Sequence, residues 1–231
     1  MFRFKQFTVT QENSAMKVCT DSCLFGALIR ANQPVNALDI GTGTGLLSLM
    51  VAQRYPQLIL DAVEIDSGSA ADARYNFTHS PFQDRLRLHE CAVQDFKTEK
   101  TYDLVFSNPP FYENRLKSPH SRKNLAHHAT GLSFRELAGI SARLLSADGT
   151  LWILLPPFEM EAFITEARSH SLGITARYTV RHDTGKPVFR EVVAFSRQHP
   201  PHAPSQEIII YENAKYSSIF AALLRDYYLI F

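Results

Sequence analysis

The sequence lacks the features that mark membrane, secreted and metal-binding proteins. Its longest apolar runs, such as 151–155, are far shorter than the roughly 20 residues of a membrane helix, and residues 1–5 lack a signal peptide's apolar stretch. The three cysteines form neither a CxxC pair nor an even set, so no disulfide framework and no metal site is expected. The net charge of +1 excludes a strongly basic nucleic-acid-binding protein but permits a local basic patch. We therefore expect a cytoplasmic protein that needs neither a metal ion nor a membrane.

The order of the apolar segments predicts an α/β fold. With 231 residues, 45% of them hydrophobic, the chain suits one compact domain. Short aliphatic runs alternate with helix-length amphipathic segments, which is typical of a mostly parallel sheet with helices on both faces. Strands are expected near 36–40, 58–64, 86–93, 102–107 and 149–155, and helices near 45–55, 67–78, 133–146 and 158–171. Segments 174–182 and 187–197 should add an antiparallel hairpin that closes one edge of the sheet, giving a seven-stranded, Rossmann-like fold.

Extensions flank this core on both sides. The expected division is an N-terminal extension that packs on the core over 1–33, a core over 34–198 and a C-terminal extension over 199–231. The first extension should contain a strand-like run over 2–9 and a helix that starts at Thr20 or Asp21, residue types that cap helices. The last follows a Pro-rich connector and should contain a strand over 207–211 and a helix from about Ser217.

A glycine-rich loop follows the first core strand. Gly41, Gly43 and Gly45 lie at the carboxyl edge, where open α/β sheets bind ligands. Because glycine has no Cβ, the backbone can turn sharply there and approach a ligand closely. A dinucleotide fingerprint would have glycine or alanine at position 46, where this sequence has Leu46. The loop therefore predicts a ligand site, but not its pyrophosphate-binding version.

Carboxylates at the strand ends narrow the choice of ligand. Asp39, just before the loop, would repel a phosphate, whereas S-adenosylmethionine carries an ammonium, a sulfonium and no phosphate. We assign Glu64, rather than Asp66, to accept hydrogen bonds from both ribose hydroxyls. Asp95, after the third strand, is either a surface carboxylate or a contact to the adenine edge. The charges favour S-adenosylmethionine as the cofactor.

An Asn-Pro-Pro-Phe sequence directly follows the predicted fourth strand. The lone pair of an adenine or amide nitrogen is delocalised, so this nitrogen is a poor nucleophile until acceptors hold its hydrogens. The Asn108 side-chain oxygen can accept one hydrogen and the Pro109 carbonyl the other, while Pro110 stiffens the turn. Phe111 can stack on a planar acceptor. In another context the prolines would only end a loop; here they predict direct transfer of methyl from sulfonium to nitrogen, with Asn108 beside the cofactor.

Together these two motifs resemble those of class I, Rossmann-like methyltransferases that act on amino groups. More specific similarities lie outside the core, in segments 4–9, 15–21 and 216–231. They resemble the bacterial tRNA1(Val) (adenine(37)-N6)-methyltransferase family, and the likeness spans essentially the whole chain. The resemblance implies a tRNA partner and transfer of the methyl group to the N6 atom of an adenine beside the valine anticodon.

The resemblance also implies roles for the segment before the first helix. Lys17, Thr20 and Asp21 would border the cofactor and acceptor pocket. Two positions depart from the pattern: Cys19 replaces a glycine of the family, and Cys91 stands where related enzymes place an aspartate after the third strand. The second departure leaves the adenine-edge contact open.

A local basic segment follows the Asn-Pro-Pro-Phe sequence. Residues 113–128 contain only one acid, Glu113, and the candidates for phosphate contacts are Arg115, Lys117, Arg122 and Lys123. We expect these side chains to hold tRNA phosphates near the active site. The alternative is a solvated surface loop of incidental charge.

Two other functions remain open from the residues alone. Asn-Pro-Pro loops also hold amides, so the chain could methylate protein glutamine, although a tyrosine commonly follows the prolines there and no N-terminal helical domain is present. Methylation of adenine N6 in another nucleic acid is a related alternative. From a different class, the chain could be an RNA scaffold that binds the cofactor without turnover, which the intact Asn108 disfavours.

Overall fold

A central eight-stranded sheet organises the protein. A computed structural model describes residues 1–14, 16–110 and 131–231. The strand order is β10-β8-β9-β7-β6-β3-β4-β5, and β9 alone among these strands runs opposite to its neighbours. The strands are β3 (Asn36–Ile40), β4 (Ile59–Glu64), β5 (Leu86–Glu90), β6 (Tyr102–Ser107), β7 (Leu145–Leu155), β8 (Gly173–Arg181), β9 (Val188–Ser196) and β10 (Ser205–Ile209). The predicted fold class, a mostly parallel sheet with an antiparallel hairpin, is confirmed.

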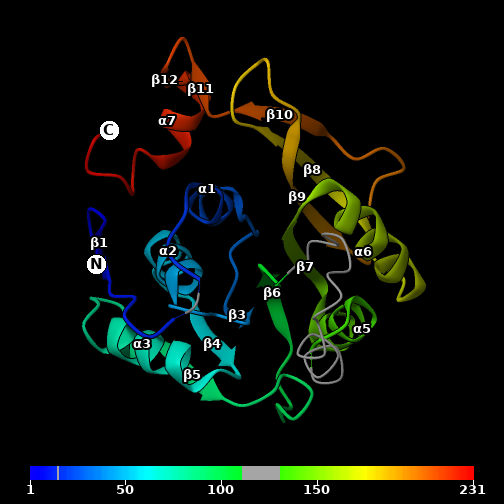
Figure 1. Ribbon diagram of the computed structural model, residues 1–231. Helices are drawn as coiled ribbons and strands as arrows, with labels where there is room; N and C mark the ends of the chain where they lie inside the picture. Colours follow the sequence, from blue (N-terminus) through cyan, green and yellow to red (C-terminus); the bar gives the residue numbers. More distant parts are fainter. Residues whose placement is uncertain (15, 111–130) are drawn as a thin grey trace, which may run out of the picture.

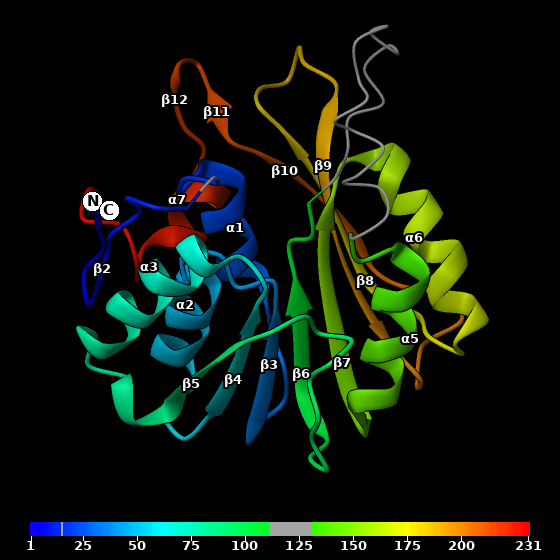
Figure 2. The same cartoon turned by 60° about the horizontal axis from the view of Figure 1, so that its bottom comes forward.

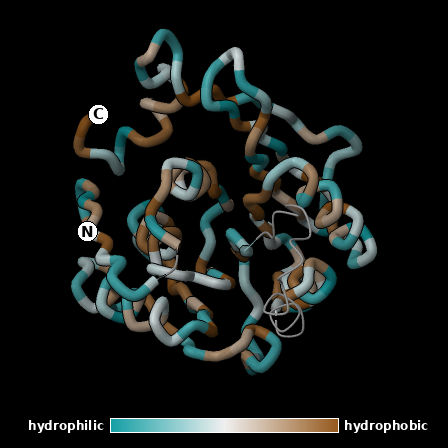
Figure 3. The backbone as a smooth tube through the Cα atoms, in the orientation of Figure 1, coloured by the Kyte–Doolittle hydropathy of each residue, from teal (hydrophilic) through white to brown (hydrophobic). Residues whose placement is uncertain are grey.

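Helices cover both faces of the sheet (Figures 1 and 2). One face carries α1 (Thr20–Leu28), α2 (Leu46–Arg54) and α3 (Ser67–Thr78), and the other carries α5 (Phe134–Leu144) and α6 (Pro157–Ser169). Alternate residues of β6 enter different cores, with Phe106 on the α1 and α2 side and Val105 on the α5 and α6 side. Several outer loops are teal, and the brown, hydrophobic parts of the tube alternate with white and teal ones within the helices and strands (Figure 3).

The number of strands corrects the expectation of seven. The C-terminal extension contributes β10, which pairs in parallel with β8 from Ser205 opposite Arg177 to Ile209 opposite Arg181. The β8–β9 hairpin is therefore not the edge of the sheet. The pairing gives the outer backbone groups of β8 hydrogen-bond partners and buries Ile208 in the core, so the extension closes an edge that would otherwise be open.

The run over residues 2–9 is not a single strand. It forms a small hairpin of β1 (Phe2–Arg3) and β2 (Thr8–Val9), which are antiparallel. Between them, Phe4 and Phe7 are both buried and their rings stack with centroids 4.5 Å apart. A straight strand would point residues 4 and 7 to opposite sides, so the turn is what lets both rings enter the core.

The two ends of the described chain pack together. After β10 come the small hairpin of β11 (Tyr211–Glu212) and β12 (Lys215–Tyr216) and then α7 (Ser218–Leu224), which packs on α1. The Lys5 ammonium donates hydrogen bonds to the Arg225 carbonyl at 2.6 Å and the Phe231 carbonyl at 2.7 Å. The β1–β2 hairpin and α7 thus lie on the side of the sheet that carries α1 (Figure 2). A short 3-10 helix, η1 (Gln83–Arg85), precedes β5. None of the described helices is long and apolar enough to cross a membrane.

Candidate active site

The glycine-rich loop joins β3 to α2 and adopts a conformation that suits glycine. The φ angles of Gly41, Gly43 and Gly45 are 73°, 57° and 81°, in the left-handed region that other residues rarely adopt. A Cβ added at Gly41 or Gly43 would meet nothing within 4 Å, whereas one at Gly45 would lie 2.5 Å from Cε1 of Phe77. Gly45 is therefore needed for packing against α3, and the other two leave open space beside the loop.

Asp39 holds this loop from beneath. Its Oδ2 accepts hydrogen bonds from the Thr42 and Ser48 hydroxyls, both at 2.7 Å. Its Oδ1 is buried and has no hydrogen-bond partner among the described residues. Burial raises the pKa of Asp39 to about 7, against the lowering effect of the two hydroxyls, and the charge of Glu64 raises it further. The residue is poised between its charged and neutral forms at neutral pH.

Glu64, at the end of β4, reaches the loop from the other side. Its Oε2 accepts a hydrogen bond from the Gly43 N–H, and its Oε1 accepts one from the Asp66 N–H, both at 2.8 Å. The Asp66 carboxylate instead caps α3 by accepting from the Ser69 N–H at 2.8 Å. The structure thus brings Glu64 and Asp39 together at the loop, and no ion pair among the described residues neutralises either one. Two neighbouring carboxylates favour a cationic ligand.

Asn108 follows β6 and lies beside the same loop. The Ser107 hydroxyl donates to the Ile40 carbonyl at 2.7 Å, which ties the end of β6 to the residue that precedes Gly41. The Asn108 Nδ2 donates to the Ser22 hydroxyl at 3.2 Å, and its Oδ1 is buried without a donor among the described residues. The site therefore contains an amide oxygen with an unfilled hydrogen-bonding position.

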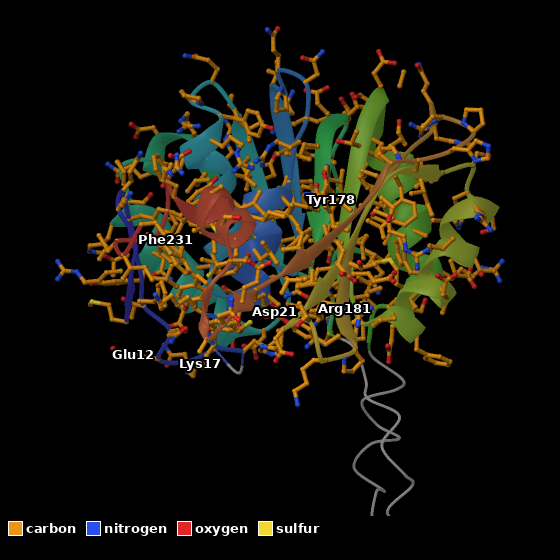
Figure 4. All side chains as sticks on the ribbon, turned by 90° about the horizontal axis from the view of Figure 1, so that it is seen from above. Glu12, Lys17, Asp21, Tyr178, Arg181 and Phe231 are labelled. Atoms are coloured by element: carbon orange, nitrogen blue, oxygen red, sulfur yellow. The ribbon has the colours of Figure 1, made fainter. Side chains whose placement is uncertain are left out.

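The start of α1 forms the next wall of the site. Thr20 is the first residue of this helix, and the Asp21 carboxylate accepts a hydrogen bond from Nε of Arg190 on β9 at 2.8 Å. The Lys17 ammonium is bound to the Gln11 carbonyl at 2.6 Å, within its own segment. Figure 4 shows Lys17 and Asp21 toward the same end of the molecule as Arg181, the last residue of β8. Of these residues, Asp21 lies directly next to Ser22, the contact of Asn108.

Two polar residues of α3 that sequence reasoning missed fasten the N-terminal segment to the loop. The Asn76 amide exchanges hydrogen bonds with the N–H and carbonyl of Thr10 and donates to the Thr44 carbonyl, all at 2.8 Å. The Asp72 carboxylate accepts bonds from Asn13 and Ser14. The sequence signal that could have identified them is their spacing of four residues, which places both side chains on one face of a helix.

Of the remaining predicted residues, three lie in the described part of the chain and five lie outside it. Asp95 is exposed, and the backbone N–H of Cys91, not of Asp95, bonds to the Glu64 carbonyl at 3.0 Å. Pro109 is buried and Pro110 exposed. Within the described residues, no group of His, Cys, Asp and Glu side chains could hold a metal ion. The predicted residues outside the described part of the chain are Phe111, Arg115, Lys117, Arg122 and Lys123.

Comparisons with known proteins agree with this geometry. The methyltransferase small domain family matches residues 13–167. A protein of Dyadobacter fermentans named tRNA1(Val) (adenine(37)-N6)-methyltransferase is 43% identical over 100% of this chain and 98% of its own length. A protein of Pedobacter heparinus with the same name is 39% identical, over 100% of this chain and 98% of its own length.

Solved structures show the same fold. A protein from Agrobacterium tumefaciens, described as a predicted O-methyltransferase, superposes with a TM-score of 0.68 at 16% identity, covering 89% of this chain and 96% of that one. At this identity the likeness concerns the fold alone. The full-length similarity to curated relatives and the matched domain together establish that the chain belongs to the tRNA1(Val) (adenine(37)-N6)-methyltransferase family, within the methyltransferase small domain family.

Proposed function

We propose that this protein transfers a methyl group from S-adenosylmethionine to the exocyclic N6 atom of adenine 37 in tRNA1(Val), and that it acts in the cytoplasm. The observation that carries the proposal is the position of Asn108. Its Oδ1, which has no donor among the described residues, lies directly after β6 and beside the glycine-rich loop. The relatives of this family carry this activity in their names.

The residues around the loop fit S-adenosylmethionine. The open sides of Gly41 and Gly43 leave room for a ligand against the backbone, and Asp39 and Glu64 supply negative charge for its ammonium and sulfonium groups. The carboxylate oxygens of Glu64 each receive one hydrogen bond and have further lone pairs for the ribose hydroxyls. When bound, the cofactor supplies an electrophilic methyl group on sulfur.

The acceptor nitrogen is prepared by the residues after β6. The Asn108 Oδ1 and the Pro109 carbonyl accept hydrogen bonds from the two hydrogens of the adenine amino group. These bonds would orient the nitrogen and direct its lone pair toward the methyl group for an in-line transfer. In that transfer the N–C bond would form as the C–S bond of the donor breaks, and the nitrogen would release one proton to solvent. Asn108 thus works by positioning and by dispersing the developing charge on the nitrogen.

The tRNA must be held with its base unpaired. An anticodon-loop purine can reach the site at a small unstacking cost, whereas a base within a duplex cannot. The phosphate contacts proposed for it are Arg115, Lys117, Arg122 and Lys123, with Phe111 stacking on the adenine. If these cations bind phosphates, activity at limiting tRNA falls as salt rises, and replacing Arg122 and Lys123 by alanine flattens that dependence.

One experiment separates the candidate functions. The purified protein is incubated with labelled S-adenosylmethionine and total tRNA, and the digested nucleosides are identified by mass spectrometry. The proposal predicts label in N6-methyladenosine that maps to position 37 of tRNA1(Val). Label on a protein glutamine, or on no adenine at all, would contradict the proposal.

A further inference from the structure

A serine at the start of α1 contacts the amide that we place in the reaction. The hydroxyl of Ser22 lies 3.2 Å from the Asn108 Nδ2, although the two residues are 86 positions apart in the chain. Ser22 is 7% exposed, so water competes little for this contact. The ion pair between Asp21 and Arg190 ties the same turn of α1 to β9. The hydroxyl therefore occupies a fixed place beside Asn108.

The direction of this hydrogen bond decides which end of the amide is free. A hydroxyl can accept one bond and donate another, and the Ser22 oxygen also lies 3.0 Å from the Cys19 sulfur. With the hydroxyl proton directed to that sulfur, Ser22 accepts the N–H of Asn108, and the amide oxygen becomes the end that has no partner in the described part of the chain. A flipped amide would present N–H groups to the adenine amino group, which is itself a donor.

We propose that Ser22 is a positioning residue that fixes the orientation of the Asn108 amide, so that its oxygen, and not its nitrogen, receives the amino group of the acceptor. This inference rests on the proposed function and adds to it the residue that prepares Asn108. Ser22 acts through Asn108, while the glycine-rich loop is held by Asp39, Glu64 and Asn76. The turnover number should therefore depend on Ser22, and the cofactor affinity should not.

The test is a comparison of Ser22→Ala with the parent protein. We expect kcat for tRNA methylation to fall about 3- to 10-fold, the effect of one neutral hydrogen bond. The dissociation constant of S-adenosylmethionine and the KM for tRNA should not change. Ser22→Thr keeps a hydroxyl and should recover most of the rate. Adding Ser22→Ala to Asn108→Ala should cause no further loss, because the amide that Ser22 orients is already gone.

Ser141→Ala is the matched control, since Ser141 is a fully buried serine of α5 whose hydroxyl has no partner among the described residues. Its kcat should equal that of the parent.

An unchanged kcat in Ser22→Ala, or a loss confined to cofactor affinity, would overturn the inference. So would an equal further loss in the Asn108→Ala background. If Ser22→Ala does not fold, Ser22→Cys, a weaker acceptor of similar shape, should show the same loss. A parent protein without activity on tRNA would contradict the proposed function instead.

Discussion

The cofactor side and the acceptor side of the site differ in how firmly the protein itself holds them. On the cofactor side, Asp39 receives two hydroxyl hydrogen bonds, Glu64 receives two backbone N–H bonds and Asn76 binds the Thr44 carbonyl. On the acceptor side, the Asn108 side chain has one hydrogen bond within the described residues, at 3.2 Å, to Ser22. The glycine-rich loop is therefore built before any ligand arrives, whereas under the proposed function the substrate's amino group would complete the acceptor side.

Removing the Asn108 side chain should distinguish the two sides most clearly, because it should affect turnover and not cofactor affinity. Asn108→Ala should lower turnover by about 100-fold or more, roughly 3 kcal/mol, as expected when a preorganised hydrogen-bonding group is lost at the reacting atom. The affinity for S-adenosylmethionine should stay nearly unchanged, because other residues hold its loop. Single-turnover methylation and calorimetric titration measure the two effects. A variant that methylates at the parental rate would remove Asn108 from the reaction.

At Glu64 we expect the opposite result, a loss of cofactor affinity. Glu64→Ala should weaken cofactor binding by about 1.5–3 kcal/mol, the contribution of charge-assisted hydrogen bonds to the ribose. The matched control is Asp66→Asn, since Asp66 caps α3 and asparagine caps helices equally well. The control should bind as the parent does in calorimetry. Equal affinity of Glu64→Ala and the parent would place Glu64 outside the cofactor site.

Weakening the attachment of the N-terminal segment to α3 tests whether that segment stabilises the glycine-rich loop. Asn76→Ala removes the bonds to Thr10 and Thr44 and leaves buried backbone groups unpaired, so it should lower the free energy of unfolding by about 2 kcal/mol. Thr78→Ala, at an exposed position of the same helix, is the control and should change stability much less. Denaturant unfolding measures both. Equal stabilities would show that the segment does not support the loop.

The smallest effect concerns the pH dependence of stability. The Asp39 pKa rises from an ordinary value of 3.8 to about 7 on folding, so the folded protein binds an extra proton between these values and loses stability as pH rises through this window. Asp39→Asn has no such proton. The stability of this variant relative to the parent should therefore increase by about 1–2 kcal/mol from pH 6 to pH 8. A difference that is constant across these pH values would contradict the raised pKa.

Sequence reasoning placed the local elements of the site and missed its long-range contacts. The positions of Gly41, Glu64 and Asn108 could be predicted because strand ends and tight turns leave signals within a few residues. Ser22 and Asn76 could not, because a polar residue on a helix is compatible with many partners, and theirs lie 86 and 66 positions away.

The errors in the fold have the same origin. The hydrophobic pattern identified the strand that became β10 but not its neighbour, because alternation specifies a face and not an edge partner. The hairpin of β1 and β2 was read as one strand because the turn between Phe4 and Phe7 contains neither glycine nor proline.

The burial of Asp39 would make cofactor binding at the proposed site a proton-linked reaction. With its pKa raised to about 7, the Asp39 carboxyl is partly protonated in the free protein at neutral pH. A bound ammonium group favours the ionised carboxylate, so binding at this pH expels a fraction of a proton into the solvent. Affinity for the methyl donor should therefore climb with pH until Asp39 is fully ionised, and the apparent heat of binding should vary with the ionisation enthalpy of the buffer.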